Sequence, residues 1–518
     1  MSYKNRRSIY STFVLIFVAL KILINLFAIG NFGFHRDEFL HLVLADHLDW
    51  GYKEVPPFIS LLAKISLSVF GDSVFASRIF TTLASGIIIW LTGQIVVELG
   101  GKRFAITLAC LALIFSPAFA ASGYLFQPVV FDQLWWVVTV WLFCRYLNTA
   151  NVKYLYWLGA AVGLGMLTKY TMAFFTGSLI IGILISRERK LLFNKHILFS
   201  ALLAFVIFLP NLIWQFAHHL PVLTHMKELR EQQLDNLSPA DFVMQQIMVN
   251  GTALVIWLTG FIFLFISFKL RRFRFIAIAY ILIFLFLLKM SGKSYYLFGA
   301  YPMLFAAGGF AFEQFFKRKV YALRVAVIVL LVLPNILLLP LVLPILPLQR
   351  TVTFIKNAET RMPFISFLTR WEDQKQHPLT QDYADMLGWE EMAQKVAAAY
   401  HQLTPEQKKQ TQIFTDSYGE AGAVNHFRRK YNLPEIISLN SSFALWAPSD
   451  LNGRYIIYVD DDDNVERRLS KIVESYKQVG EITTPLARER GVRIYLLVNP
   501  SPKLNEVYRA ELEQRRLR

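Results

Sequence analysis

The sequence predicts a polytopic α-helical membrane protein that carries a C-terminal α/β domain. Of its 518 residues, 55% are hydrophobic and only 17% are charged, an apolar share above that of a soluble domain. Many of the apolar residues gather in runs of about 20, long enough to cross a bilayer. From about residue 350 charges recur every few residues. We therefore expect a membrane domain over residues 1–349 and a soluble α/β domain over residues 350–518.

The positive charge follows the membrane domain. Residues 1–349 hold 29 Lys and Arg against 14 Asp and Glu, and residues 350–518 hold 24 against 23, which together give the net charge of +16. The cations cluster at alternate ends of the apolar runs, which is the positive-inside pattern and predicts a cytoplasmic amino terminus. This pattern accounts for the positive net charge, so the charge does not require a nucleic-acid partner. The clusters are Lys4 to Arg7, Lys102-Arg103, Arg145 with Lys153, Arg187 to Lys190, Lys269 to Arg274, and Lys317 to Lys319.

About eleven spans are expected, an odd number that would place the carboxyl-terminal domain outside, in the periplasm of a cell whose inner membrane holds the chain. The first run follows basic residues and has no small-residue cleavage site, so we interpret it as an uncleaved anchor. The candidate spans lie near residues 9–30, 76–99, 104–121, 128–147, 154–169, 170–186, 196–216, 249–268, 274–290, 295–313 and 321–347. The run on either side of Lys169 is either two short helices or one span with a re-entrant piece.

Two outer loops are long, residues 31–75 and 217–248, and loops of that length are more often functional than idle. Apolar positions recur with a helical period from Phe58 to Leu67, which predicts an amphipathic helix along the membrane surface. In the soluble domain the pattern predicts a helix over Tyr383 to Leu403 and buried strands at residues 412–415, 454–459 and 492–498. The two cysteines, Cys110 and Cys144, lie in apolar spans, so neither a disulfide framework nor a thiolate metal site is expected.

The strongest functional signal is the pair Asp37-Glu38, which follows the first apolar run. His35, Arg36 and His41 lie within about one helical turn of it. A carboxylate beside a cation stays ionised and can act as a base, and ionisable groups beside a bilayer are usually functional. The alternative is a pair of solvated loop acids that only end a helix.

Three weaker signals lie near the same face of the membrane. Trp50 and Tyr52, followed by two prolines, form an aromatic platform for a sugar or a lipid head group, although both residue types are routine interface anchors. Asp132 lies just inside the fourth span, where an acid is either functional or pairs with a neighbouring cation. Lys169 suits an anionic substrate, and snorkelling explains it equally well.

The segment from Lys289 to Tyr301 is more specific. It joins Lys289 and Lys293 to Tyr295, Tyr296 and Tyr301 at a break between helices on the outer side. Cations placed against the positive-inside trend need an anion, and a lipid-linked phosphate is the natural candidate.

Other motifs point to no additional chemistry. The run Asp460 to Asp463 reads better as a solvated turn than as a metal site, because no spaced ligands accompany it. His218, His219 and His225 are too loosely spaced for zinc. The chain has no Gly-rich phosphate loop, nucleophile elbow or kinase signature, so a nucleotide-driven machine is disfavoured.

Four motifs, in order along residues 1–349, resemble the bacterial branch of the GT-C membrane glycosyltransferases. This is the dolichyl-phosphate-mannose protein mannosyltransferase type, which includes aminoarabinose transferase. The motifs are Phe34-His-Arg-Asp37-Glu38-Phe, then Asp46-His-Leu-Asp-Trp50-Gly-Tyr with Pro56-Pro57, then Gly165-Met-Leu-Thr-Lys169, then Gly292-Lys-Ser-Tyr-Tyr with Tyr301-Pro.

The resemblance implies transfer of a sugar, usually with inversion, from a polyprenyl-phosphate carrier to a protein, lipid A or another envelope glycan at the outer face. It implies that Asp37 is the general base, that Glu38 orients the acceptor or tunes that base, and that Lys293 with Tyr295 holds the donor phosphate. Tyr296, Lys169 and Lys289 are further candidates for the donor, and His35, Arg36, His41, Trp50, Tyr52 and Asp132 for the substrate.

The chain departs from aminoarabinose transferases at one point: it has Val55-Pro56-Pro57 where they carry Lys-Pro, and its nearest lysine is Lys53. No nucleotide or redox cofactor is implied. Related enzymes differ in their need for a divalent metal, and the sequence offers no metal-ligand set beyond acids.

Two other classes remain open. A transporter or flippase of lipid-linked or sugar substrates would also have many spans with buried charge, but it should contain paired hydropathy repeats with broken helices at mid-membrane depth, which we do not find. A scaffolding membrane protein would tolerate alanine at Asp37, Lys169 and Lys293.

Overall fold

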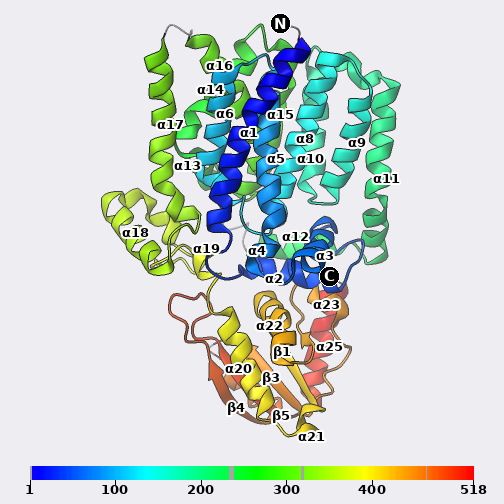
Figure 1. Ribbon diagram of the computed structural model, residues 1–518. Coiled ribbons are helices and arrows are strands. Elements are labelled where there is room, and N and C mark those ends of the chain that lie inside the picture. The colour runs from blue at the N-terminus through cyan, green and yellow to red at the C-terminus, as the bar shows by residue number, and fades with distance from the viewer. Residues whose placement is uncertain (1–2, 233–237, 317–319, 463, 518) are drawn as a thin grey trace.

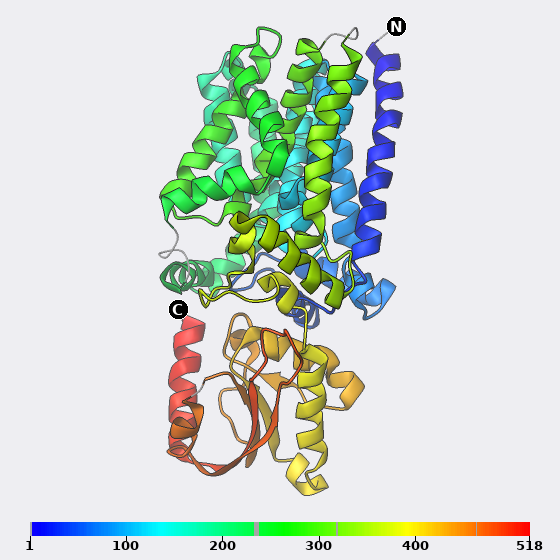
Figure 2. The same cartoon turned by 90° about the vertical axis from the view of Figure 1, so that its left-hand side faces the viewer.

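The computed structural model describes residues 3–232, 238–316, 320–462 and 464–517. Two layers are evident in Figure 1: a bundle of long helices and, at one end of it, a smaller domain with a β-sheet. The amino terminus lies at the opposite end of the bundle, and Figure 2 shows the same arrangement from the side.

Each of the eleven predicted spans coincides with a helix of the bundle. Helices suit these apolar runs because a backbone in lipid must satisfy its hydrogen bonds internally. The bundle helices are α1 (Tyr3–Ala28), α5 (Ile79–Glu98), α6 (Arg103–Phe115) followed by the short α7 (Pro117–Ala121), α8 (Pro128–Thr149), α9 (Lys153–Met166), α10 (Thr171–Ile185), α11 (Lys195–Ala217), α14 (Leu254–Ile266), α15 (Arg274–Lys289), α16 (Tyr301–Phe315) and α17 (Tyr321–Val342).

The number of spans stays a prediction. Within the described residues, four helices are long and apolar enough to cross a membrane: Ile9–Ala28, Val74–Glu98, Lys195–Ala217 and Tyr321–Val342. A fifth span is added if the bent pair Pro239–Met248 and Gly251–Ile266 is counted as one. Helices such as α9 and α10, with 14 and 15 residues, reach only about 21–23 Å at 1.5 Å per residue. The run around Lys169 is two helices, which resolves the alternative left by the sequence.

The first long loop lies between the bundle and the sheet domain, whereas the second begins there and then continues along the bundle, where its second helix packs against α15 (Figure 1). The second loop includes residues 233–237, which are outside the described part of the chain. The first loop folds as α2 (Arg36–Val43), the 3-10 turn η1 (Leu44–Asp46), α3 (Phe58–Phe70) and α4 (Val74–Ser77), and the second as α12 (Pro221–Gln232) and α13 (Pro239–Met248). The predicted amphipathic helix is α3, and Leu61, Ile65 and Val69 along it are exposed.

A short helical layer connects the bundle to the sheet. It comprises α18 (Leu348–Arg361), the 3-10 segment η7 (Pro363–Thr369) and α19 (Gln381–Ala384). Ile355 of α18 and Tyr383 of α19 share an apolar cluster with Ile29 and Tyr124 of the bundle side. The layer therefore packs on the bundle, and the chain then enters the sheet domain.

The sheet has five strands in the order β2-β1-β3-β5-β4. Strands β2, β1 and β3 are parallel, and β5 and β4 continue the sheet antiparallel. One face packs on α20 and α22 through residues such as Ile413 and Ile457, and the other on α24 and α25 through residues such as Ile456 and Leu497. The elements are α20 (Trp389–His401), α21 (Pro405–Lys408), β1 (Thr411–Thr415), α22 (Tyr418–Tyr431), β2 (Ile436–Ile437), α23 (Phe443–Trp446), β3 (Tyr455–Asp460), α24 (Val465–Leu469), β4 (Val473–Glu481), β5 (Arg493–Pro500) and α25 (Pro502–Leu517).

The three strands predicted from the sequence are confirmed as β1, β3 and β5. The single helix predicted over Tyr383 to Leu403 is wrong, because the chain breaks into α19 and α20 at Gly388. This glycine adopts a φ of 86° at the N-cap of α20, a left-handed conformation that favours glycine.

Charge is distributed unequally between the two ends of the bundle. The basic clusters at Lys102-Arg103, Arg187 to Lys190 and Lys269 to Arg274 lie in turns between helices at the amino-terminal end, and the sheet domain lies at the other end (Figure 1). The cluster at Lys317 to Lys319 is outside the described residues. This arrangement has the one-sidedness that the positive-inside pattern predicts.

Candidate active site

The acidic pair begins a short helix, α2, that is capped by its own sequence. The His35 ring nitrogen Nδ1 accepts a hydrogen bond from the Asp37 backbone N–H at 3.2 Å, and a Glu38 carboxylate oxygen accepts from the His35 N–H at 2.8 Å. This is a capping box, with His in the place of the usual Ser or Thr. It places the two adjacent carboxylates on different sides of the first helical turn.

Glu38 is fully buried and its carboxylate is saturated. One oxygen accepts from Arg78 Nε at 2.8 Å and from the Phe126 N–H at 2.7 Å, and the other from Arg78 Nη2 at 2.7 Å and from the His35 N–H. Burial raises the pKa of Glu38, but the Arg78 charge and these hydrogen bonds lower it more, so the pKa lies below its usual value. Glu38 thus ties α2 to the start of α5 and to the segment before α8.

Asp37 faces the space between the bundle and the sheet domain. Its carboxylate accepts hydrogen bonds from the Tyr418 hydroxyl at 2.7 Å and from the Gln127 amide at 3.0 Å, and 38% of the side chain remains exposed. Burial raises the pKa of Asp37, but the nearby His35, the Tyr418 hydrogen bond and the Arg36 charge together lower it below its usual value. Asp37 is therefore an ionised, oriented carboxylate that still has room for an acceptor.

Cations and phenols from two other breaks between helices reach the same space. Lys169, between α9 and α10, places its ammonium 4.8 Å and 4.4 Å from the ring centres of Tyr295 and Tyr296. These tyrosines lie in the 3-10 segment η6 (Ser294–Ala300), directly after Lys293. Tyr295 and Lys293 each interact electrostatically with Asp37. A carboxylate, two ammonium groups and two phenols thus lie in one region, at the end of the bundle that meets the C-terminal domain.

The other predicted site residues have different positions. His41 is buried on α2, and burial lowers its pKa to about 4 despite the nearby acids, so its ring is neutral at pH 7. Asp132 accepts from the Trp136 indole at 3.0 Å and from the Thr171 hydroxyl at 2.8 Å, which joins α8 to α10 beside Lys169. Lys289 is exposed at the end of α15.

Arg36 faces the sheet domain. It stacks on the Tyr418 ring at 4.7 Å and lies 4.0 Å from the Glu489 carboxylate. His35 is also close to that side, with its Nε2 3.9 Å from Asp385. Both residues therefore hold the loop against the C-terminal domain.

The aromatic motif of the first loop does not reach Asp37 through any described contact. Trp50 is 56% exposed, and its carbonyl accepts a hydrogen bond from Asn211. Tyr52 is buried, and its hydroxyl bonds the carbonyl of His47 at 2.9 Å. Lys53, the lysine nearest to the position where aminoarabinose transferases have theirs, donates to the Arg515 carbonyl at 2.8 Å.

Three residues that the sequence reasoning missed complete this region: Arg78, Gln127 and Tyr418. Arg78 is a lone arginine at the start of a span, at the end where the positive-inside rule predicts few cations. The same argument singled out Lys293. Tyr418 directly follows strand β1 and the N-cap Ser417, at the carboxyl end of parallel strands where α/β domains present functional groups. Gln127 carries no comparable signal.

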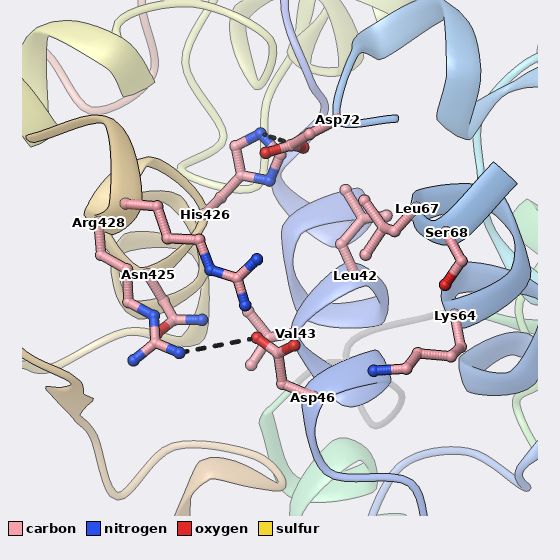
Figure 3. A pocket seen from close by; sticks show the side chains of 11 residues that line it. Leu42, Val43, Asp46, Lys64, Leu67, Ser68, Asp72, Asn425, His426 and Arg428 are labelled. Carbon is pink, nitrogen blue, oxygen red and sulfur yellow. Dashed lines mark ion pairs between the residues drawn. The ribbon is translucent and has the colours of Figure 1, made fainter. Parts of the chain in front are cut away.

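A separate pocket of about 310 Å³ opens between α2, α3 and α22 (Figure 3). The Asp46 carboxylate lies 3.9 Å from Arg428 across it, and Asp72 lies 3.1 Å from His426. None of the predicted site residues lines this pocket, which belongs to the boundary between the outer loop and the C-terminal domain. Among the described residues, no three His, Cys, Asp or Glu side chains are grouped so that they could hold a metal ion.

Comparisons with known proteins agree with this architecture. The model of the family described as dolichyl-phosphate-mannose-protein mannosyltransferase matches residues 54–214. No curated protein matches the chain in sequence.

Solved structures match the chain over most of its length. ArnT from Cupriavidus metallidurans bound to undecaprenyl phosphate is 14% identical, with a TM-score of 0.65 over 94% of this chain and 98% of that one. The apo form of the same protein gives 13% identity and a TM-score of 0.63 over the same shares. The arabinofuranosyltransferase AftD from Mycobacteria is 11% identical, with a TM-score of 0.51 over 94% of this chain and 40% of that one. The chain is therefore a multi-pass membrane protein with the fold of the GT-C glycosyltransferases, and its residues 54–214 match the mannosyltransferase family.

Proposed function

We propose that this chain is a glycosyltransferase that moves a sugar from a polyprenyl-phosphate-linked donor to an acceptor in the cell envelope, at the outer face of the membrane. The observation that carries the proposal is the convergence of ionised Asp37 with Lys169, Lys293 and Tyr295 at the end of the bundle that meets the C-terminal domain. The reaction needs a base on one side of the anomeric carbon and cationic or phenolic donors on the other, and the site supplies both. The fold shared with ArnT, solved with undecaprenyl phosphate, supports the choice of donor.

The proposed step is a single displacement. The acceptor hydroxyl or amine gives its proton to Asp37 and attacks the anomeric carbon, while the bond from that carbon to the phosphate oxygen breaks. The electron pair leaves with the polyprenyl phosphate, and attack from the opposite side inverts the configuration. Lys293 and Lys169 stabilise the charge that develops on the leaving phosphate, and the phenols of Tyr295 and Tyr296 provide further donors.

Glu38 is proposed as a positioning residue. With four hydrogen bonds to its two oxygens it has little capacity left to take a proton, and its bond to the His35 N–H fixes the turn that aims Asp37.

The test is sugar transfer from polyprenyl-phosphate donors in membranes that contain the wild type, Asp37→Asn or Asp241→Asn at equal expression. Asp241 is an exposed acid of the second long loop, outside the four motifs, and serves as the control. Loss of the base should lower the rate about 10²- to 10⁴-fold with donor binding retained, and Asp241→Asn should transfer normally. Undiminished transfer by Asp37→Asn would remove Asp37 from the mechanism. A wild type that transfers from no donor of a broad panel, but moves lipid-linked sugar across the bilayer, would favour a flippase.

A further inference from the structure

We propose that the C-terminal domain is part of the active centre, and that Tyr418, which it supplies, is the positioning residue that orients Asp37 for proton transfer. This inference rests on the proposed function for its catalytic meaning and on geometry for its physical content. The Tyr418 hydroxyl donates to Asp37 Oδ1 at 2.7 Å, although 381 positions separate the two residues in the chain.

The fold of the C-terminal domain delivers this tyrosine to the membrane domain. Strand β1 ends at Thr415, and Ser417 caps α22 by accepting from the Glu420 N–H while Glu420 accepts from the Ser417 N–H. Tyr418 is the first residue of α22, so its side chain leaves from the end of the helix that faces Asp37. The partial positive charge of a helix amino terminus also favours a carboxylate there.

Two glycines let α22 approach α2 closely. A Cβ on Gly419 would lie 2.6 Å from the Arg36 side chain, and one on Gly422 would lie 2.7 Å from Phe39 Cβ. Both distances are shorter than non-bonded carbon atoms tolerate. The sequence Ser417-Tyr-Gly-Glu-Ala-Gly422 is therefore matched in shape to the helix that carries Asp37.

Arg36 contacts the ring of the same tyrosine. Its guanidinium lies over the Tyr418 ring at 4.7 Å and approaches Glu489 at 4.0 Å. The phenol is thus held by a stacked cation on its ring and by the carboxylate that its hydroxyl bonds. Burial and the neighbouring Asp37 raise the pKa of Tyr418 well above its usual value, so the hydroxyl remains a donor throughout the physiological range.

A fixed donor changes what Asp37 can do. The hydrogen bonds from Tyr418 and Gln127, one to each carboxylate oxygen, restrict rotation of the group while 38% of the side chain stays exposed to an acceptor. Orientation of this kind raises kcat rather than affinity for the donor, because it acts on the proton transfer. If the C-terminal domain only recognised the acceptor, the hydrogen bond from Tyr418 to Asp37 would not be required.

The experiment compares Tyr418→Phe with Tyr508→Phe, which removes a hydroxyl bonded at the same 2.7 Å to the Pro448 carbonyl within the domain. In Tyr418→Phe, we expect kcat to fall about 10- to 100-fold, as for one hydrogen bond to a charged group, with the KM for the donor unchanged. The acid limb of the pH profile should move to higher pH, because the lost donor favoured ionised Asp37. Tyr508→Phe should leave kcat and the pH profile as in the wild type.

A second measurement does not depend on transfer. Carbodiimide labelling of Asp37, followed by mass spectrometry across pH, reports where this carboxyl becomes protonated, and Tyr418→Phe should move that point upward. The other titratable or charged groups near Asp37 remain in both proteins: His35, Arg36 and His41 on or beside α2, Lys293 and Tyr295 from the η6 region, and Asp382 from α19.

The outcomes separate the two proposals. An unchanged labelling midpoint, or an unchanged kcat and pH profile, would overturn the role of Tyr418. A lower kcat with the wild-type pH profile and a lowered thermal stability would also overturn it, because that is what a merely structural residue produces. A shifted midpoint in a protein that transfers no sugar would overturn the proposed function and keep the positioning contact.

Discussion

Two adjacent carboxylates illustrate how position decides chemistry at the scale of single residues. Neighbouring side chains on a helix point about 100° apart, so Glu38 enters the protein and Asp37 faces the space beneath the bundle. Glu38 accepts two hydrogen bonds from Arg78 and two from backbone N–H groups, whereas Asp37 keeps 38% of its side chain exposed. Glu38 therefore suits a structural role, and Asp37 suits a catalytic one.

We predict that Glu38→Gln destabilises the protein strongly. The substitution leaves the Arg78 guanidinium buried without a counter-charge, and removal of one partner of a buried pair typically costs about 3–5 kcal/mol. Thermal unfolding of the purified protein in detergent would measure the loss. The double variant Glu38→Gln with Arg78→Gln should be more stable than the single variant, and a single variant as stable as the wild type would contradict the prediction.

The same pair predicts a dependence of stability on pH. Because the pKa of Glu38 is lowered on folding, its contribution is present above the usual glutamate pKa of about 4.3 and is lost as the pH falls through the folded value. The stability difference between the wild type and Glu38→Gln should therefore shrink below about pH 4.

Sequence reasoning located the reactive segment but not all of its partners. Asp37, Lys169, Lys293 and Tyr295 stood out because each is charged or phenolic at an apolar boundary, and the structure brings these four residues to one region. Tyr418 belongs to a domain far along the chain, and its contact depends on docking that no local pattern describes. The same limit applies to Trp50 and Tyr52: an aromatic motif does not reveal which ring packs inward.

At the scale of elements, the packing of α22 on α2 connects the two domains. Gly419 and Gly422 lie on the face of α22 that meets Arg36 and Phe39. Phe39 also packs edge-on against Trp389 of α20 and His426 of α22. A second contact joins the segment after Trp50 to α23, where Ser442 bonds the Lys53 N–H and the Glu54 carboxylate. The C-terminal domain is thus held to the first loop through α22 and, separately, through the start of α23.

We predict that Gly422→Ala loosens this docking. The added Cβ would lie 2.7 Å from Phe39 Cβ and 3.1 Å from the Phe39 carbonyl carbon, and overpacking of this kind typically costs about 1–3 kcal/mol. Hydrogen exchange at α2 and α22 should increase, and the transfer rate should fall because Tyr418 moves with α22.

Gly177→Ala is the matched control, because a Cβ at that position of α10 meets nothing within 4 Å. It should preserve hydrogen exchange and stabilise the helix slightly, if it changes stability at all. Equal behaviour of the two alanine variants would mean that α22 is not fitted closely to α2.

At the scale of the whole molecule, the chemistry is concentrated at one end of the bundle. The breaks that carry Asp37, Lys169 and Lys293 all lie at the end that meets the C-terminal domain, and the described basic turns lie at the other (Figure 1). The sequence predicted this polarity from the basic clusters in the turns at one end and from the acidic and phenolic motifs at the other. The count of eleven spans stays a prediction, because only four of the described helices are individually long and apolar enough to cross a membrane, or five spans if one bent pair is counted as one.

The last prediction concerns orientation in the membrane. We expect Ser475→Cys, on the exposed strand β4, to react with a membrane-impermeant maleimide added to intact spheroplasts, and Asn151→Cys, in the turn between α8 and α9, to react only after permeabilisation. Neither substitution changes the charges that set topology, and the native Cys110 and Cys144 are buried, which keeps the background low. The opposite labelling would place the active site and the donor phosphate on the cytoplasmic side. The basic clusters would then face outward, against the rule that predicted the topology.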